Sequence, residues 1–318
     1  MMSAAATWIW EDGIGETRAA LIVDGCIVEA AIEPHGPALR VGAVVEARIA
    51  EAVPGGGAIV VADEIEALLD RIPPRTGTGR TIRVAVVRDA IPEAGRPKRA
   101  KVVASDAAVA PAPTLRDRIA ASGIPARQLR AHEPDALEAA GWSELLAEAL
   151  TGEIAFPGGA LRLSPTPAMT LFDVDGAGPA EPLAIAGARA AVAAIRRMGI
   201  GGSVGIDLPT LAGKGPRAAV AAAIDAALPL PFERTAVNGF GFLQIVRPRP
   251  RASLPELLRS DPIAAEARAL LRRLEREPLG SPTHHRVPPA VLRHLEPHPD
   301  WLELLARRTG VRHRLDTL

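Results

Sequence analysis

The chain has 318 residues, with 37 basic and 37 acidic side chains and therefore a formal net charge of zero. Hydrophobic residues make up 48% of the chain, which is too many for a disordered protein. Charged residues make up 23%, which is too many for a membrane-embedded helix bundle. The zero net charge excludes a globally basic nucleic-acid binder, and the single cysteine, Cys26, excludes a disulfide framework and any zinc site built on two or more thiolates.

The charges are segregated along the chain. Residues 1–70 hold three basic and twelve acidic side chains, whereas residues 71–101 hold nine basic and two acidic ones. The stretch from Arg247 onward is again basic, with fourteen arginines against nine acids. A local basic patch can bind phosphate on a neutral molecule, because salt screens each charge beyond about 8–10 Å. Solvated surfaces of an arginine-rich protein explain the same pattern.

The first residues have no basic side chain before their apolar stretch, which differs from the pattern of a secretory signal peptide. No uninterrupted apolar run approaches the ~18 residues that span a bilayer. We therefore expect a soluble cytoplasmic protein with no membrane partner.

The first hundred residues have the pattern of short strands separated by turns rich in glycine and proline. Asp24-Gly25, between two apolar runs, is a hairpin signal. Several short strands over about seventy residues predict a small barrel of the OB type. Cys26 follows this turn, and we expect it to be a small buried apolar residue of a strand. The expected strands are Thr17–Val23, Ile27–Ile32, Val41–Ala50, Ala58–Val61 and Thr81–Val87.

After residue 113 the pattern changes to helices that alternate with strands. Such alternation predicts an α/β layer with a partly parallel sheet. The expected helices are Thr114–Ser122, Pro134–Leu150 with Trp142, Leu145, Leu146 and Leu150 on one face, Glu181–Arg197, Pro216–Leu228, Asp261–Glu277, Pro288–Leu295 and Trp301–Arg308. The expected strands are Ala160–Leu163, Met169–Val174, Ser203–Ile206 and Phe240–Arg247.

Two of these strands end in carboxylates. Asp173 and Asp175 stand at positions i and i+2 at the end of one strand, and Asp207 follows another. Positions i and i+2 of a strand point to the same side, where carboxylates repel unless a cation or a raised pKa relieves them. The pattern is typical of a Mg²⁺ site at the edge where open α/β sheets gather ligands. On spacing alone, helix capping and turn formation are the simpler interpretation.

Four stretches occur in the order and spacing of a known family. Residues 15–21 with Asp24-Gly25 and Ile32-Glu33 are similar to its N-terminal strand pair. Ala168–Asp175 is similar to its ALTxIDVN segment, and Gly201–Leu208 to its GGxIxIDF segment. Its RFGLLE…R.R…SL segment is similar to Phe240–Gln244 with Arg247, Arg249, Ser253 and Leu254. Together these stretches cover most of residues 13–258, and the chain resembles the ribonuclease E/G family of bacterial endoribonucleases.

The resemblance implies an α/β (α+β) fold with an RNase H-like and a DNase I-like part in the catalytic core. We expect residues 1–36 with 106–160 to form the RNase H-like subdomain and residues 37–105 an inserted OB-type RNA-binding barrel. Residues 161–258 are expected to form the DNase I-like catalytic subdomain, and residues 259–318 a small helical C-terminal segment.

The resemblance also implies hydrolysis of single-stranded RNA by metal-activated water, leaving a 5′-phosphate. Asp173 and Asp207 match the two family aspartates that bind Mg²⁺ (or Mn²⁺). Asp175 stands where the family has an asparagine, and an acid there is expected to orient the site or join the metal. Contacts to RNA phosphates are expected from Lys98, Arg99, Lys101, Lys214, Arg247 and Arg249.

The chain departs from the family at several positions. Ile59 and Leu68 are aliphatic where the family has RNA-stacking aromatic residues, so we expect that stacking, worth ~1–3 kcal/mol per base, to be lost on the barrel. Gly239 replaces an arginine, and Thr210 replaces an acid. The 5′-end sensor has almost no room, and its signature is missing. The family's Cys-x-x-Cys zinc link is absent, so no zinc is expected and any oligomer would not be zinc-linked.

Two alternatives remain open. One is a catalytically degenerate RNA-binding or assembly protein of the same fold, and the other is a metal-dependent enzyme acting on another phosphodiester or nucleotide. Phe240 and Phe242 are interpreted as core residues at strand spacing rather than as base-stacking residues. Four histidines lack a regular ligand spacing and are interpreted as surface residues of a loop region: His284, His285, His294 and His298.

Overall fold

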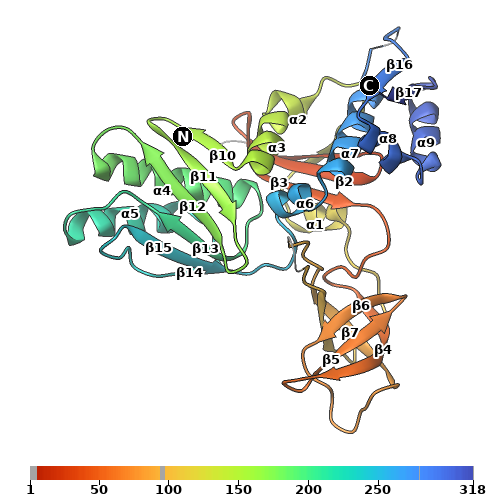
Figure 1. Ribbon diagram of the computed structural model, residues 1–318, viewed down its shortest axis with the longest axis horizontal. Helices are drawn as coiled ribbons and strands as arrows, with labels where there is room; N and C mark the ends of the chain where they lie inside the picture. The colour runs from red at the N-terminus through yellow and green to blue at the C-terminus, as the bar shows by residue number, and fades with distance from the viewer. Residues whose placement is uncertain (1–5, 94–96, 279, 318) are drawn as a thin grey trace.

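A four-stranded sheet is formed by the first strands together with a later one. The computed structural model describes residues 6–93, 97–278 and 280–317 (Figure 1). The strand order is β3-β2-β1-β9, with β9 parallel to β1 and the other pairs antiparallel. Asp24 and Gly25 form the expected turn with positive φ. The strands are β1 (Thr7–Asp12), β2 (Glu16–Val23), β3 (Cys26–Pro34) and β9 (Ala126–Gln128).

Each face of this first sheet is covered. Helix α1 (Leu115–Ala121) packs Leu115 and Ile119 against Trp8, Ala19 and Leu21, and the opposite face joins the main core. A reciprocal capping box of Thr114 and Asp117 begins the helix where the sequence predicts it. Cys26 is exposed, and the expectation of a buried cysteine was therefore wrong. It is the first residue after the turn, where no sheet or helix covers it.

A closed five-stranded barrel is inserted between β3 and α1. Its order is β4-β5-β6-β8-β7, and small alternating residues such as Ala58, Val60 and Ala62 fill its interior. Figure 1 shows the barrel standing apart from the two sheets. The expected inserted barrel is thus present. The strands are β4 (Val44–Val53), β5 (Gly57–Ala62), β6 (Ile65–Leu69), β7 (Thr81–Arg88) and β8 (Ala100–Ala104).

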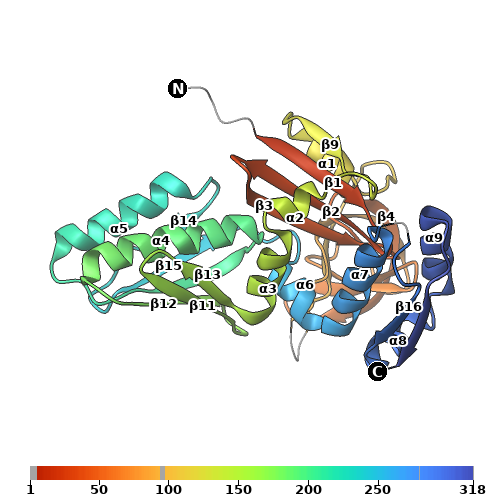
Figure 2. The ribbon, with the colours of Figure 1, turned by 90° about the horizontal axis from the view of Figure 1, so that it is seen from above.

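The second sheet is mixed and has the order β10-β11-β12-β13-β15-β14. Its one parallel pair is β12–β13, connected through helix α4 (Ala180–Arg197), and α5 (Lys214–Ala227) follows β13. Figure 2 shows both helices over the same face of the sheet, which leaves the other face open. The strands are β10 (Glu153–Phe156), β11 (Gly159–Pro165), β12 (Thr170–Gly176), β13 (Gly202–Asp207), β14 (Glu233–Arg234) and β15 (Phe242–Arg247).

The expected helix Pro134–Leu150 is two helices, α2 (Ala136–Ala139) and α3 (Trp142–Thr151). Gly141 separates them with a φ of 94°, a conformation that glycine adopts without steric cost. Because the helix begins anew after this break, Ala149 faces the core and Leu150 is 41% exposed. The sequence pattern had placed Leu150 on the buried face.

The C-terminal residues wrap back onto the first sheet. Ile14 is buried among residues of α7 and α9, such as Leu271 and Leu305, and Trp301 lies against Gly15. The segment is helical as expected, but its last strand is paired in parallel with β16. The elements are α6 (Leu254–Ser260), α7 (Pro262–Glu275), β16 (His284–Val287), α8 (Pro289–Leu295), α9 (Pro299–Thr309) and β17 (Arg314–Thr317).

The histidines of this segment are less exposed than expected. His284 and His285 lie in β16 rather than in a loop, and only His284 is fully exposed. His298 stacks on Trp301 with ring centroids 4.1 Å apart, and His294 is half-buried. His284 is thus exposed as expected, whereas His285, His294 and His298 are half-buried.

Within the described part of the chain, no helix is both long and apolar enough to cross a lipid bilayer.

Candidate functional site

The carboxylates predicted from the sequence meet at one edge of the second sheet. Asp173 of β12 and Asp207 of β13 are direct partners in the parallel register, so their Cα atoms are separated by only one strand spacing, about 4.8 Å. Phe172, Val174 and Ile206 point into the core beneath α4 and α5. The alternation of the strands therefore directs the two aspartates to the open face.

Asp175 extends this group along β12 on the same face. Burial raises the pKa of Asp173, and the negative charges of Asp175 and Asp207 raise it further. These charges act on Asp173 because the three carboxylates share one side of the sheet. We call Asp173, Asp175 and Asp207 the acidic edge.

Arg162 is a cation that acts on Asp173 of this edge. It is the β11 partner of Asp173, its Nε donates to Glu153 at 3.1 Å, and its positive charge opposes the rise in the pKa of Asp173. Glu153, Asp175 and Asp173 in turn raise the pKa of Arg162. A single guanidinium that is already paired with Glu153 leaves the three aspartates with excess negative charge.

The donor set of the acidic edge fits a hard divalent cation. Mg²⁺ in proteins is commonly held by one or two carboxylates, with water and substrate phosphate oxygens in its other positions. Asp173 and Asp207, with Asp175 beside them, offer this arrangement. Within the described residues, the three aspartates do not bring one oxygen each within 4.8 Å of one another, so a shared ion would draw the side chains together.

Two phenyl rings lie beside the acidic edge. Phe242 is the β15 partner of Asp207, and its ring lies over Gly205. A Cβ added to Gly205 would lie 2.6 Å from this ring and 3.0 Å from the Met169 sulfur. Phe240 is 85% exposed, so the expectation that it packs in the core was wrong. It belongs to a turn before β15, in which Asn238 Oδ1 accepts the N–H groups of Phe240 and Phe242.

The start of α5 brings positive charge close to the same edge. Lys214 is the exposed first residue of that helix, seven positions after Asp207. The sequence did not single out Arg217, yet its guanidinium lies 3.6 Å from where a Cβ of Gly239 would be. Arg217 therefore places a guanidinium beside the turn before β15 from a separate helix, a relation that a linear motif cannot reveal.

The other predicted RNA contacts lie away from the acidic edge. Arg247 is opposite Gly202, five positions along β15 from the partner of Asp207, a separation of about 17 Å. Arg249 donates to Glu93 at 2.8 Å and also pairs with Glu256, and Lys98 lies 2.6 Å from the same Glu93. On the barrel, Arg99 pairs with Glu66 and Lys101 with Asp70, each at 2.7 Å. Four of the six predicted cations are therefore engaged in ion pairs.

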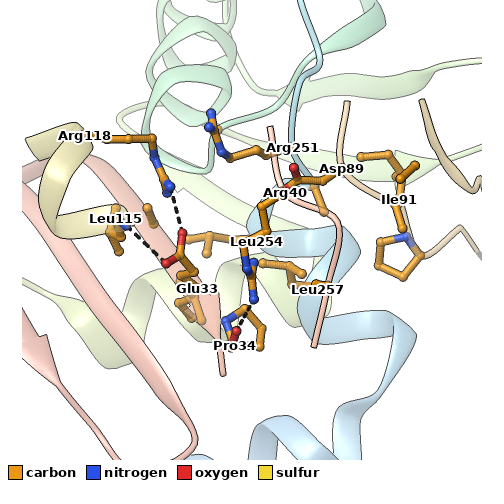
Figure 3. Close-up of a pocket in the computed structure, with 18 of the residues that line it drawn as sticks. Glu33, Pro34, Arg40, Asp89, Ile91, Leu115, Arg118, Arg251, Leu254 and Leu257 are labelled. Atoms are coloured by element: carbon orange, nitrogen blue, oxygen red, sulfur yellow. Dashed lines mark hydrogen bonds and ion pairs between the residues drawn. The ribbon is translucent and has the colours of Figure 1, made fainter. Parts of the chain in front are cut away.

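A cavity lies where the barrel joins the rest of the protein, not at the acidic edge. It has a volume of about 710 Å³ and is bordered by the end of β3, by α1, by the base of the barrel and by residues 251–257 (Figure 3). We call it the barrel-base cavity. Arg40, Arg118 and Arg251 line it, with Glu33 and Asp89 as the nearest acids.

These charges are unequally satisfied. Glu33 accepts from Arg118 at 2.7 Å, and Asp89 accepts the Val41 N–H at 2.6 Å while burial raises the pKa of Asp89. Arg251 makes no hydrogen bond or ion pair with any described residue, and burial beside Arg118 lowers its pKa. A half-buried guanidinium of this kind suits an anionic ligand. The three arginines come from separate segments, so the sequence did not point to the cavity.

No protein-family model matches the chain, and no curated protein sequence matches it. The resemblance to the ribonuclease E/G family therefore rests on the segments described under Sequence analysis.

Proposed function

We propose that the protein is a Mg²⁺-dependent endoribonuclease that hydrolyses phosphodiester bonds of single-stranded RNA. The observation that carries the proposal is the register of the parallel pair, in which Asp173 and Asp207 are direct partners on the open face with Asp175 beside them. The RNase H-like and DNase I-like identity of the two sheets, and the OB identity of the barrel, belong to the same proposal.

In this mechanism Asp173 and Asp207 would hold the ion, and Asp175 would be a third ligand or accept a hydrogen bond from bound water. When bound, Mg²⁺ would activate water and neutralise charge that develops on the phosphate. Phe240 and Phe242 provide apolar faces for bases on either side of the cleaved bond. Lys214 and Arg217 approach the backbone phosphate from the start of α5.

The first prediction tests the acidic edge by removing charge without changing side-chain shape. We expect Asp173→Asn and Asp207→Asn each to lower Mg²⁺-dependent cleavage of a fluorescent single-stranded RNA by at least about 100-fold, since even indirect partners of metal ligands cost 10–100-fold. The assay compares the purified full chain and both variants over a Mg²⁺ series.

Asp106→Asn is the matched control. Asp106 lies on an exposed loop and its side chain forms no hydrogen bond or ion pair with a described residue, so cleavage by this variant should equal that of the wild type. Equal activity of the wild type, Asp173→Asn and Asp207→Asn would contradict the proposed mechanism.

A second candidate is an RNA-binding or assembly protein without catalysis. The barrel-base cavity favours it, because Arg251, which has no partner among the described residues, lines this cavity and not the acidic edge. In that case RNA would bind without Mg²⁺, no cleavage would occur, and Arg251→Ala would weaken binding while Asp173→Asn would not. Metal-dependent cleavage abolished in Asp173→Asn would exclude this candidate.

A further inference from the structure

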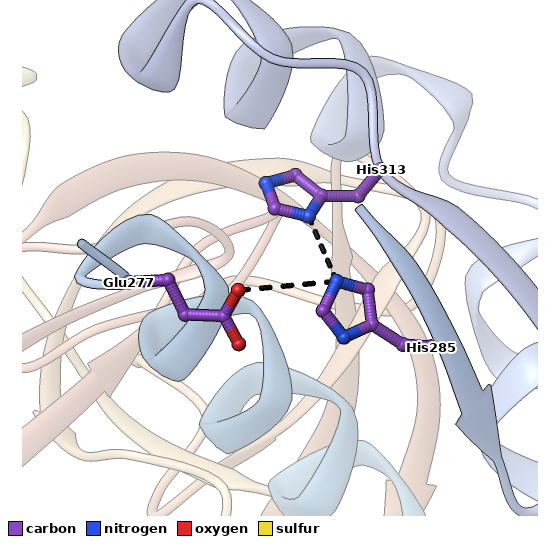
Figure 4. A group of neighbouring side chains, drawn as sticks. All are labelled: Glu277, His285 and His313. Carbon is purple, nitrogen blue, oxygen red and sulfur yellow. Dashed lines mark hydrogen bonds and ion pairs between the residues drawn. The ribbon is translucent and has the colours of Figure 1, made fainter. Parts of the chain in front are cut away.

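A second group of metal-ligand side chains lies in the C-terminal segment, remote from the acidic edge in the fold. Glu277 follows the end of α7, His285 lies in β16, and His313 directly precedes β17 (Figure 4). Each offers one ligand atom, and these atoms all lie within 4.8 Å of one another. Among the described residues, this is the one set of three histidine, cysteine or acidic residues with that geometry.

The distances within the group suit a tetrahedral ion. Zn²⁺ binds histidine nitrogen and carboxylate oxygen at about 2.0–2.1 Å, which places neighbouring ligand atoms about 3.3 Å apart. His285 Nε2 lies 3.0 Å from His313 Nδ1 and 3.9 Å from Glu277 Oε2. One distance is slightly shorter and the other slightly longer than the required separation. Small side-chain rotations would therefore be enough to enclose an ion.

The group is incompletely satisfied by the protein alone. Glu277 Oε2 is buried and has no hydrogen-bond partner among the described residues. The side chains of His285 and Glu277 are 15% and 23% exposed, so little water reaches them. Figure 4 shows the carboxylate and the His313 ring both directed at the same nitrogen of His285, an arrangement in which only one of them can be paired optimally. A cation between the three side chains would satisfy all of them.

The ligand types select the class of ion. Imidazole nitrogen favours zinc and neighbouring transition metals, whereas Mg²⁺ prefers an all-oxygen environment.

We propose that Glu277, His285 and His313 bind a zinc-class divalent ion, with a water molecule in the fourth position. The ion joins the end of α7 to β16 and to the residue before β17, segments separated by up to 36 positions along the chain. This proposal departs from the prediction that no zinc is bound. That prediction was based on the absence of paired thiolates and on the irregular spacing of the histidines. The zinc-class site does not depend on the ribonuclease proposal.

The test is a titration of metal-free full-length protein with Zn²⁺ by calorimetry and with Co²⁺ by visible absorption. It is carried out in an Asp173→Asn/Asp207→Asn background, so that binding at the acidic edge contributes nothing. We expect one equivalent of Zn²⁺ to bind, visible absorption bands of low-symmetry Co²⁺, and a higher unfolding temperature on metal addition.

In the same background, His313→Ala and His285→Gln should weaken Zn²⁺ binding at least about 10-fold and remove the Co²⁺ bands. His284→Gln is the matched control, because His284 is the neighbour of His285 but pairs with Asp316. Circular dichroism checks that each variant is folded. Absence of a one-to-one equivalent, or unchanged affinity in folded His313→Ala, would overturn the proposal.

Discussion

Asp173 combines two opposed requirements in one side chain. Its pKa is raised by burial and by Asp175 and Asp207, which means that the ionised form is disfavoured in the folded protein. The metal proposed for this edge requires that ionised form. The local repulsion thus lowers the stability of the metal-free protein and favours the binding of a cation.

The stability of the metal-free protein should report this repulsion. The folded-state pKa of Asp173 lies above its unfolded-state value, so the carboxylate lowers stability at neutral pH, and that cost disappears as the pH falls through the folded-state pKa. We expect Asp173→Asn to raise the unfolding temperature at neutral pH. The corresponding gain in the free energy of unfolding should be no more than about 1 kcal/mol, because the side chain of Asp173 is partly exposed. The gain should vanish in acid.

Calorimetry of metal-free wild type and Asp173→Asn across this pH range measures the effect, with Asp106→Asn as the control. Added Mg²⁺ should stabilise the wild type and leave the variant unchanged. An Asp173→Asn variant less stable than the wild type at neutral pH would show that the three carboxylates do not repel.

The residues of the candidate site differ in how visible they were in the sequence. Asp173, Asp175 and Asp207 were predictable because each follows an apolar strand, and strand period alone fixes the side on which they lie. Arg162 and Arg217 were not, because their positions depend on strand register and on the packing of α5. Such relations between distant segments leave no local pattern.

At the scale of elements, the turn before β15 determines how an aromatic residue is presented. Asn238 binds the two N–H groups that follow it, and Gly241 has a φ of 93°. This turn interrupts the alternation expected from Phe240 onward. Phe240 therefore projects into solvent near the acidic edge instead of entering the core.

We expect Phe240→Ala to weaken binding of single-stranded RNA about 10-fold, since a stacked base contributes ~1–3 kcal/mol. The unfolding temperature should not change, because the ring is 85% exposed. Fluorescence anisotropy with Ca²⁺ in place of Mg²⁺ measures binding without cleavage. Leu230→Ala, at a residue 79% exposed, is the control, and equal RNA affinity of Phe240→Ala and the wild type would argue against stacking.

Helices and strands were predicted correctly where one hydrophobic periodicity runs through a long segment. The prediction failed for short elements. The long helices α4, α5, α7 and α9 were predicted within three residues at each end. Strands β6 and β8, of five residues each, were missed because so few positions cannot establish alternation. The pair β16–β17 was missed because its strands are polar and are paired across a separation of thirty positions.

At the scale of the whole molecule, a buried network of charges fastens α7 to the first sheet. Arg18 is 2% exposed; its Nε donates to Glu16 at 2.6 Å, and it lies 3.7 Å from Glu11. From α7, Arg268 pairs with Glu16 at 2.7 Å and Arg272 with Glu11 at 3.0 Å. These ion pairs therefore join α7 of the C-terminal segment to the first strands.

Breaking this network should be costly. We expect Arg18→Leu to lower the free energy of unfolding by about 3–5 kcal/mol, because it removes the buried cation that Glu16 and Glu11 share and leaves each carboxylate with its α7 partner alone. Urea unfolding followed by tryptophan fluorescence measures it. Arg307→Leu, which removes an exposed pair with Glu303, should change stability by only about 0.3–0.5 kcal/mol. Similar effects of both substitutions would show that the buried charges do not couple α7 to the sheet.

This network also constrains when the protein can finish folding during its synthesis. Arg18 donates to the backbone carbonyl of Arg268, a residue 250 positions later. At about 5–20 residues per second, the ribosome needs roughly 12–50 s to deliver that partner after Arg18. Throughout this interval the first sheet lacks the α7 and α9 residues that bury Ile14 and the carbonyl that accepts from Arg18. The nascent chain therefore exposes an apolar and charged surface until the last helices arrive to cover it.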